Sequence, residues 1–193
     1  MGLVLALKNR HQVVVAADHD PAADDSAFSP LMVLPSHCVL LTAGNLEAAR
    51  PLVVDGLMPR LHKDSSAAAV AQLLHAALVL RAVPTLPQLK GRIEFIVAGI
   101  DPVRHILEPG LYYLDSASQF NLQLVRADVA FAGATAAVSQ HLDGRTFPDA
   151  SVSQLKAIAK ECLTATKLRW PGAVNNSIRI GVITEDSTQV EEL

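Results

Sequence analysis

Two short apolar runs begin the pattern of hydrophobic and polar positions along the chain. Leu3–Leu7 and Val13–Ala17 are separated by the polar break Asn9–Gln12, and the second run ends at Asp18. Aliphatic runs of this length on either side of a polar break are typical of two antiparallel strands joined in a hairpin. Neither run alternates with polar residues, which indicates strands covered on both faces. We therefore expect the hairpin at the centre of a layered fold rather than at an edge.

The register of this hairpin decides what lies beside its first strand. If Lys8 pairs with Val13 across the polar break, Asp18 lies opposite Leu3. A shift of one residue would move the carboxylate to the other face of the sheet. With the expected register, a carboxylate lies next to the N-terminal end of the first strand, and Asp18 is the first candidate site residue.

The remaining pattern alternates groups of strands with pairs of helices. Further strands are predicted over Leu31–Leu34, Cys38–Ala43, Ile93–Ile100, Gly110–Asp115, Phe120–Val125, Ala127–Ala132, Ser177–Thr184 and around Val190. Helices are predicted from a cap at Asn45 with a bend at Pro51, Gly56 and Pro59, from Asp64–Ser66, over Ala136–Leu142, and from Asp149 or Ser151 to Trp170. This order predicts a single domain over residues 1–193, of the α+β class, with a four-layer αββα sandwich in which helix pairs lie outside two sheets.

The helix predicted over Ala67–Arg81 is apolar around nearly its whole circumference. Such a helix is buried on two sides, in this case between its own sheet and a neighbouring molecule. Half of all residues are hydrophobic and only 4% are aromatic, so alanine, valine and leucine supply the excess. We interpret this composition as surface that other copies of the chain cover, with a densely packed core as the alternative.

Charge and composition argue against several classes of function. The net charge of −3, without a basic stripe, argues against nucleic acid and anionic membranes as partners. Ala67–Val83 is too short and too interrupted to span a bilayer. Because no basic segment with a hydrophobic region and a cleavage site begins the chain, we expect a cytoplasmic protein. Cys38, Cys162 and the seven histidines show no metal-ligand spacing, so we expect neither metal nor cofactor and interpret Asp18–Asp20 as part of a solvated acidic loop.

Five local patterns follow one another over nearly the whole chain. They are GLVLALKNRHQVVVAAD, LLTAGNLEAARPLV, FIVAGID followed by LYYLD, AFAGAT, and SIRIGVIT. In this order they resemble the first hairpin, the strand–Ala-Gly–helix junction, a later hairpin, a Gly-Ser-Gly turn and the closing strand of proteasome β-type subunits. The resemblance is to the bacterial proteasome-homologue type and implies the N-terminal-nucleophile hydrolase fold.

In that family an N-terminal threonine hydroxyl attacks the peptide carbonyl, and its own α-amine is the base. A lysine, two aspartates and a serine tune these groups, and a glycine N–H supplies the oxyanion hole. The resemblance places Gly2 (or Met1, if the register slips) at the threonine, Pro30 at the lysine, Ala134 at the serine and Pro171 at the second aspartate. Asp18 and Gly44 match the first aspartate and the oxyanion glycine. The sequence thus predicts a remnant site of Gly2, Asp18 and Gly44 in which no confident catalytic residue remains.

Two of these residues also have structural interpretations. Asp18 would anchor the following loop through backbone N–H groups, and Gly44 would be required by its backbone conformation. Thr42 and Thr135 are the hydroxyl residues closest to the remnant site in the sequence motifs. We interpret them as a strand residue and a helix cap rather than as nucleophiles.

Three hypotheses for function remain. The first is a catalytically silent proteasome β-type-like subunit that assembles into a homo-oligomeric ring, and the resemblance implies an unfoldase ATPase or other proteasome-like subunits as further partners. The second is an active N-terminal-nucleophile or differently primed peptidase or amidase of a self-compartmentalised protease, whose turnover would depend on Asp18. The third is a non-enzymatic binding or scaffold module that uses the remnant cleft.

Overall fold

The computed structural model describes residues 2–19, 28–88, 90–135, 138–139, 142, 145–172 and 177–192. Within these residues, ten strands form two five-stranded antiparallel sheets, so the protein belongs to the mixed α+β class. In strand order the first sheet contains β10 (Thr188–Glu192), β9 (Ser177–Ile183), β2 (Val13–His19), β1 (Leu3–Lys8) and β8 (Val129–Gly133). The second contains β3 (Leu31–Val33), β4 (Val39–Gly44), β5 (Ile93–Val103), β6 (Ile106–Asp115) and β7 (Gln123–Leu124).

The first hairpin has the predicted position and the predicted register. β1 and β2 are antiparallel, and Lys8 pairs with Val13. β2 is the middle strand of its sheet, and β1 lies between β2 and β8. Leu3–Leu7 is fully buried, as expected for an apolar strand without polar alternation. The expectation that this hairpin avoids a sheet edge is therefore confirmed.

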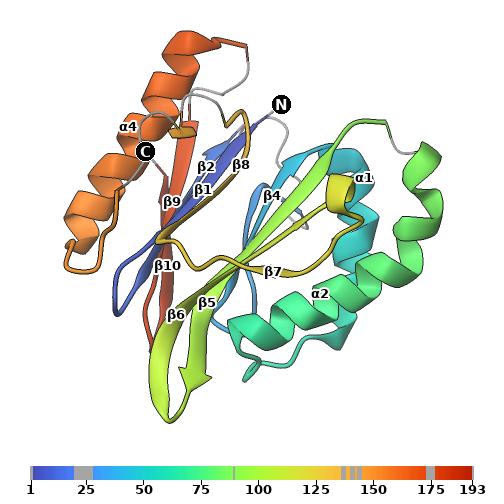
Figure 1. Ribbon diagram of the computed structural model, residues 1–193, viewed down its shortest axis with the longest axis horizontal. Helices are drawn as coiled ribbons and strands as arrows, with labels where there is room; N and C mark the ends of the chain where they lie inside the picture. The colour runs from blue at the N-terminus through green and yellow to red at the C-terminus, as the bar shows by residue number, and fades with distance from the viewer. Residues whose placement is uncertain are drawn as a thin grey trace.

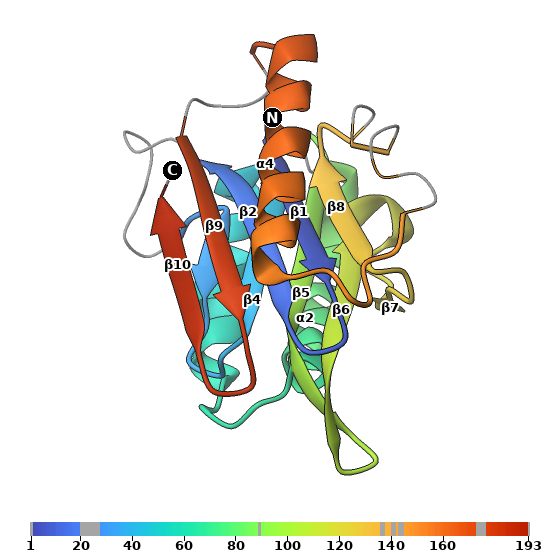
Figure 2. The same cartoon turned by 90° about the vertical axis from the view of Figure 1, so that its left-hand side faces the viewer.

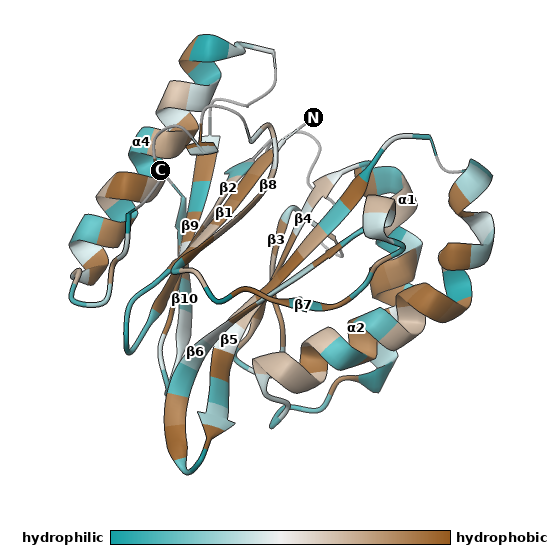
Figure 3. Ribbon diagram, viewed as in Figure 1, coloured by the Kyte–Doolittle hydropathy of each residue, from teal (hydrophilic) through white to brown (hydrophobic). Residues whose placement is uncertain are grey.

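Three groups of buried apolar residues hold the elements together. One lies between the two sheets and includes Val4, Val15, Leu41 and Ile96. A second lies between the second sheet and the helices α1 (Leu46–Pro51) and α2 (Ala67–Arg81). A third lies between the first sheet and α4 (Val152–Arg169). Figures 1 and 2 show α4 on one side of the paired sheets and α1 and α2 on the other, and Figure 3 shows brown, hydrophobic stretches in the strands between them.

Polar side chains fix the start of each of these helices. Asn45 accepts a hydrogen bond from the Ala48 N–H, and Ser66 accepts one from the Ala69 N–H. At α4 it is Ser151, rather than Asp149, that caps the helix, in a capping box with Gln154. Such caps satisfy N–H groups that lack a partner inside the helix. The helix after Asn45 is irregular as predicted, because α1 continues as a π-helical segment over Leu52–Leu57 and a 3-10 turn over Met58–Arg60.

Three elements differ from the expectations. β5 and β6 pair as far as Val103 and Ile106, well beyond the predicted ends. β7 is limited to Gln123–Leu124. The chain itself buries one side of α2 only, since Leu80 on the outer side is 71% exposed. The helix predicted over 136–142 lies largely outside the described residues.

Candidate functional site

Asp18 lies near the end of β2, beside the first residues of β1. Continuing the observed pairing one step beyond Val4 and Ala17 places Asp18 opposite Leu3. The backbone N–H of Leu3 donates to Oδ1 of Asp18 at 2.8 Å. Asp18 is only 4% exposed, and a buried carboxylate requires partners of this kind. Asp18 therefore fixes the N-terminal end of the first strand.

Gly2 lies directly against this carboxylate. A Cβ atom placed on Gly2 would lie 2.5 Å from Oδ1 of Asp18, well inside the distance of ordinary van der Waals contact. The backbone of Gly2 is also held, because its carbonyl accepts a hydrogen bond from the Ala134 N–H at 3.1 Å. A side chain at residue 2 would therefore require the Asp18 carboxylate to move.

Gly44 is required by the backbone at the end of β4. Its φ of +91° lies in the left-handed region, which favours glycine. A Cβ atom at this position would overlap the carbonyl oxygen of Arg92. That oxygen accepts the Asn45 N–H at 2.8 Å, so β4 and the chain before β5 approach closely here. These contacts favour the structural interpretation of Gly44.

Gly133, which the sequence did not identify as a site residue, joins the two parts of the site. Its φ is +90°, and a Cβ atom on it would overlap the carbonyl oxygen of Gly2. The same atom would lie 3.3 Å from the Cβ of Ala43, the residue before Gly44. Because Gly133 belongs to the first sheet and Ala43 to the second, the two sheets meet at this point. Gly2, Asp18 and Gly44 are thus gathered at one end of the paired sheets.

A buried carboxylate network lies at the same end and was also missed. Glu94 on β5 is 5% exposed. Its Oε2 accepts the Gly133 N–H at 2.9 Å, and its Oε1 accepts the Tyr113 hydroxyl at 2.6 Å. Arg92 lies 3.4 Å from Glu94 and 3.6 Å from Asp115. The only signal in the sequence was an acidic residue inside the apolar run of β5, which does not identify its partners.

The pKa values of Tyr113 and Arg92 keep both groups protonated at neutral pH. Burial, the hydrogen bond to Glu94 and the nearby Glu94 and Asp115 charges raise the pKa of Tyr113. Burial lowers the pKa of Arg92, but the neighbouring Glu94, Tyr113 and Asp115 outweigh burial and raise it overall. At neutral pH Tyr113 is therefore a hydroxyl donor and Arg92 a cation. Neither group is suited to remove a proton from a nucleophile.

The positions that resemble the family's other catalytic residues carry no suitable groups. Pro30 lies before β3, and its carbonyl accepts the Thr42 N–H at 2.9 Å. Ala134 lies beside Gly2 but has only a methyl side chain. Pro171 lies in an exposed turn after α4. Met1 lies outside the described residues.

The positions of the candidate hydroxyl and thiol groups favour structural interpretations over nucleophilic ones. Thr42 alternates with Val39, Leu41 and Ala43, which face the other sheet, so Thr42 faces the helices. The Thr135 carbonyl accepts the Ser139 N–H at 3.0 Å, as at the start of a helical turn. Burial raises the pKa of both cysteine thiols to about 11, which favours inert packing over nucleophilic reactivity.

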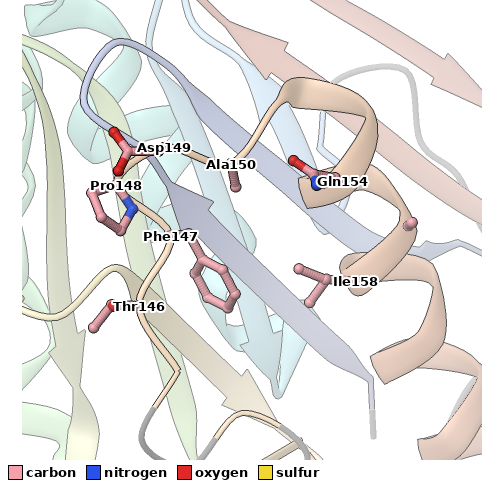
Figure 4. A pocket seen from close by; sticks show the side chains of 8 residues that line it. Thr146, Phe147, Pro148, Asp149, Ala150, Gln154 and Ile158 are labelled. Carbon is pink, nitrogen blue, oxygen red and sulfur yellow. The ribbon is translucent and has the colours of Figure 1, made fainter.

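A hollow of about 630 Å³ lies on the α4 side of the first sheet. Phe147 and Ile158 face each other across it, with Asp149 and Gln154 at its rim (Figure 4). Asp149 pairs with Arg10 at 3.4 Å. The hollow thus combines apolar walls with a carboxylate that is already paired, which is not the arrangement of a hydrolytic centre.

Metal and membrane binding receive no positive support. In the described part of the chain, no group of three or more His, Cys, Asp or Glu side chains is placed to hold a metal ion. Among the described helices, none has both the length and the apolar character needed to cross a bilayer. Comparison of the chain with protein-family models gave no match, and a search of curated proteins gave none either.

Proposed function

We propose that this chain is a proteasome β-type-like subunit that does not hydrolyse peptides and serves as a structural member of a ring-shaped homo-oligomer. The observation that carries the proposal is the contact between Gly2 and Asp18. With Asp18 bound to the Leu3 N–H, its carboxylate fills the space that a side chain at position 2 would need.

The groups that the N-terminal-nucleophile mechanism requires support the proposal that the chain does not hydrolyse peptides. That mechanism needs a hydroxyl nucleophile, a base and groups that orient both. At the corresponding positions this chain has Gly2, Pro30, Ala134 and Pro171, none of which carries a hydroxyl or an ionisable side chain. Asp18 remains, but its Oδ1 is already bonded to the backbone of β1.

The four-layer αββα order of the N-terminal-nucleophile fold is part of the same proposal. It is supported by the apolar contacts of α4 with the first sheet and of α1 and α2 with the second. The outer side of α2, where Val79 and Leu80 are 41% and 71% exposed, supports assembly. Large apolar side chains exposed next to each other on a helix are typical of surfaces that another protein covers.

Two measurements on the full chain test the proposal. Native mass spectrometry and negative-stain electron microscopy at micromolar concentration should show rings whose mass is a multiple of 20.5 kDa. A panel of fluorogenic peptides with basic, acidic and hydrophobic residues before the scissile bond should give no turnover above buffer. The Asp18→Ala variant is the control for hydrolysis. A monomer would contradict the proposed ring assembly. Turnover that disappears in Asp18→Ala would contradict the proposed lack of hydrolysis.

A further inference from the structure

The β5–β6 hairpin extends beyond the sheet that contains it. β4 pairs with β5 only over Ile93–Ala98, whereas β5 and β6 remain paired to Val103 and Ile106. Residues 99–110 therefore form a two-stranded projection, which we call the arm. It is the green ribbon that points away from the helices and the other strands in Figures 1 and 2. A two-stranded ribbon alone is marginally stable in water, so the arm needs support.

The arm is held in a fixed direction at its base. Asp101 is 6% exposed. Its Oδ2 accepts the Tyr112 hydroxyl and its Oδ1 accepts the Ala68 N–H of α2, both at 2.7 Å. Gly110 makes room for this carboxylate, because a Cβ atom there would overlap Oδ2 of Asp101. The base of the arm is thus tied to the second sheet and to α2.

The tip of the arm is a two-residue turn with apolar side chains on either side. Arg104 and His105 both have positive φ, 49° and 69°, as in the two-residue turns that match the twist of a hairpin. Val103, Ile106 and Leu107 flank this turn and are 40%, 63% and 40% exposed. Figure 3 shows this part of the ribbon in brown. A projection that carries exposed apolar side chains beside its turn is suited to insert into another surface.

A hollow of about 530 Å³ lies at the foot of the arm. Pro102 and Leu107 of the arm line one side of it. The other sides come from Ser36 in the β3–β4 turn, from Asp64 before α2 and from Glu185 in the β9–β10 turn. The projection and the hollow therefore adjoin each other on one surface of the molecule.

The charge at the tip of the arm is opposite in sign to the net charge of the hollow. The tip carries Arg104, and the hollow carries Asp64 and Glu185 beside a single lysine, Lys63, all of them exposed. Within the described residues, none of these side chains forms an ion pair. Each is therefore available to a charge on another molecule.

We propose that the arm of one copy enters the hollow of a second copy across a two-fold axis. Because arm and hollow adjoin, a single two-fold rotation can bring each arm to the hollow of the other copy, which is a self-complementary contact. In this contact Ile106 is buried from water, and Arg104 pairs with Asp64 and Glu185 of the other copy. The contact goes beyond ring assembly and would be formed whether or not the chain builds a ring.

Disulfide trapping in the full chain tests the contact directly. The Arg104→Cys/Asp64→Cys variant is made in ¹⁴N and ¹⁵N forms, which are mixed, oxidised and separated in denaturant without reductant. Cys38 and Cys162 are 1% and 0% exposed and give little background. We expect covalent dimers closed by two disulfides, in which mass spectrometry finds light peptides joined to heavy ones. Absence of an intermolecular disulfide, or a disulfide within one chain, would overturn the proposal. A ladder of longer covalent multimers would overturn the two-fold geometry.

Matched substitutions separate the arm from general surface effects. Ile106→Asp, added to the double-cysteine variant, should lower the yield of covalent dimer on the order of tenfold, because it places a carboxylate in an apolar contact. Leu124→Asp is the control, since Leu124 on β7 is 59% exposed against 63% for Ile106. Equal yields from the two variants would overturn the proposal.

A charge exchange remains informative if Ile106→Asp fails to fold. In the chain with its natural cysteines, Arg104→Glu should weaken self-association measured by sedimentation velocity, and Asp64→Arg/Glu185→Arg added to it should restore association. An Arg104→Glu variant that associates as the parent does would overturn the proposal. Native mass spectrometry distinguishes this contact from ring assembly. Rings that form without disulfide trapping between arm and hollow would contradict only the proposed arm contact. Two-fold dimers without rings would contradict only the proposed ring.

Discussion

Two carboxylate–tyrosine pairs on β5 and β6 face opposite sides of the same sheet. Glu94 accepts the hydroxyl of Tyr113 at 2.6 Å, and Asp101 accepts that of Tyr112 at 2.7 Å. Both carboxylates are nearly buried. Each also accepts one backbone N–H, from Gly133 in the first sheet for Glu94 and from Ala68 in α2 for Asp101.

The difference between the pairs follows from the alternation of side chains along a strand. Glu94 shares its face with Ile96, toward the other sheet, whereas Asp101 shares the opposite face with Phe95, toward the helices. At one end of the sheet, the carboxylate–tyrosine pair thus links the second sheet to the first. At the other end, the equivalent pair links the projecting arm to α2. At the first end, which we call the closed end, the Asp18 carboxylate fills the space beside Gly2, whereas the second end carries exposed apolar side chains.

The largest expected effect comes from breaking the closed end. Gly133→Ala puts a Cβ atom where the carbonyl oxygen of Gly2 lies and forces alanine into positive φ. We expect a loss of about 4 kcal/mol in the free energy of unfolding, measured by urea titration at fixed protein concentration. Gly172→Ala is the control, because nothing lies within 4 Å of its Cβ position. Similar values for both variants would contradict the close packing of this end.

Removing each carboxylate in turn compares the two pairs directly. Glu94→Ala leaves the Gly133 N–H and the Tyr113 hydroxyl without this acceptor, and it also removes one of the two carboxylates that pair with Arg92. We expect a loss of about 3 kcal/mol for Glu94→Ala and about 2 kcal/mol for Asp101→Ala. Urea titration measures both, with the exposed Glu108→Ala as the control. The reverse order would show that the arm end, rather than the closed end, is the more tightly held.

The hairpin, its register and the order of elements could be predicted because they depend on apolar runs and their polar breaks. The carboxylate–tyrosine pairs could not, since Glu94 and Tyr113 are far apart in the sequence and meet only through the β5–β6 register. The arm was missed because Pro102 and Pro109 suggest the ends of strands. Of the site, Asp18 beside Leu3 followed from the register, whereas its contact with Gly2 depends on the side-chain position.

The stability that the two carboxylate–tyrosine pairs contribute should depend on pH, because the tyrosine hydroxyls ionise at high pH. Burial and the hydrogen bonds to Asp101 and Glu94 raise the pKa of Tyr112 and of Tyr113 above the usual value. A group whose pKa is raised in the folded state stabilises it fully below the unfolded pKa of about 10 and loses this contribution as pH rises further. We expect the parent protein to lose stability more steeply above about pH 10 than Tyr112→Phe/Tyr113→Phe.

Thermal unfolding between pH 8 and about pH 11 measures this difference. Below about pH 9 each single Phe variant should cost about 1 kcal/mol, because one carboxylate loses one donor. The two buried cysteines are present in parent and variants alike, so their own titration contributes to both profiles. Parallel pH profiles for the parent and the double variant would contradict the raised pKa values.

An equally small effect is expected for the space beside residue 2. Gly2→Thr places a Cβ atom 2.5 Å from Oδ1 of Asp18, so the carboxylate must move away from the Leu3 N–H that it accepts. We expect a loss of about 1 kcal/mol in the free energy of unfolding. Asp18→Ala relieves the collision, so the double variant Gly2→Thr/Asp18→Ala should cost less than the sum of its parts.

The same substitution tests whether a hydroxyl alone restores chemistry. A threonine at position 2 still lacks an ionisable side chain at Pro30 and at Pro171, and a hydroxyl at Ala134. Because these groups act together in the N-terminal-nucleophile mechanism, hydrolysis of the fluorogenic peptides should stay at the level of buffer. Turnover by Gly2→Thr would show that a nucleophile at position 2 is sufficient for hydrolysis. In the stability measurement, additive costs of Gly2→Thr and Asp18→Ala would show that a side chain at position 2 and the Asp18 carboxylate do not compete for one space.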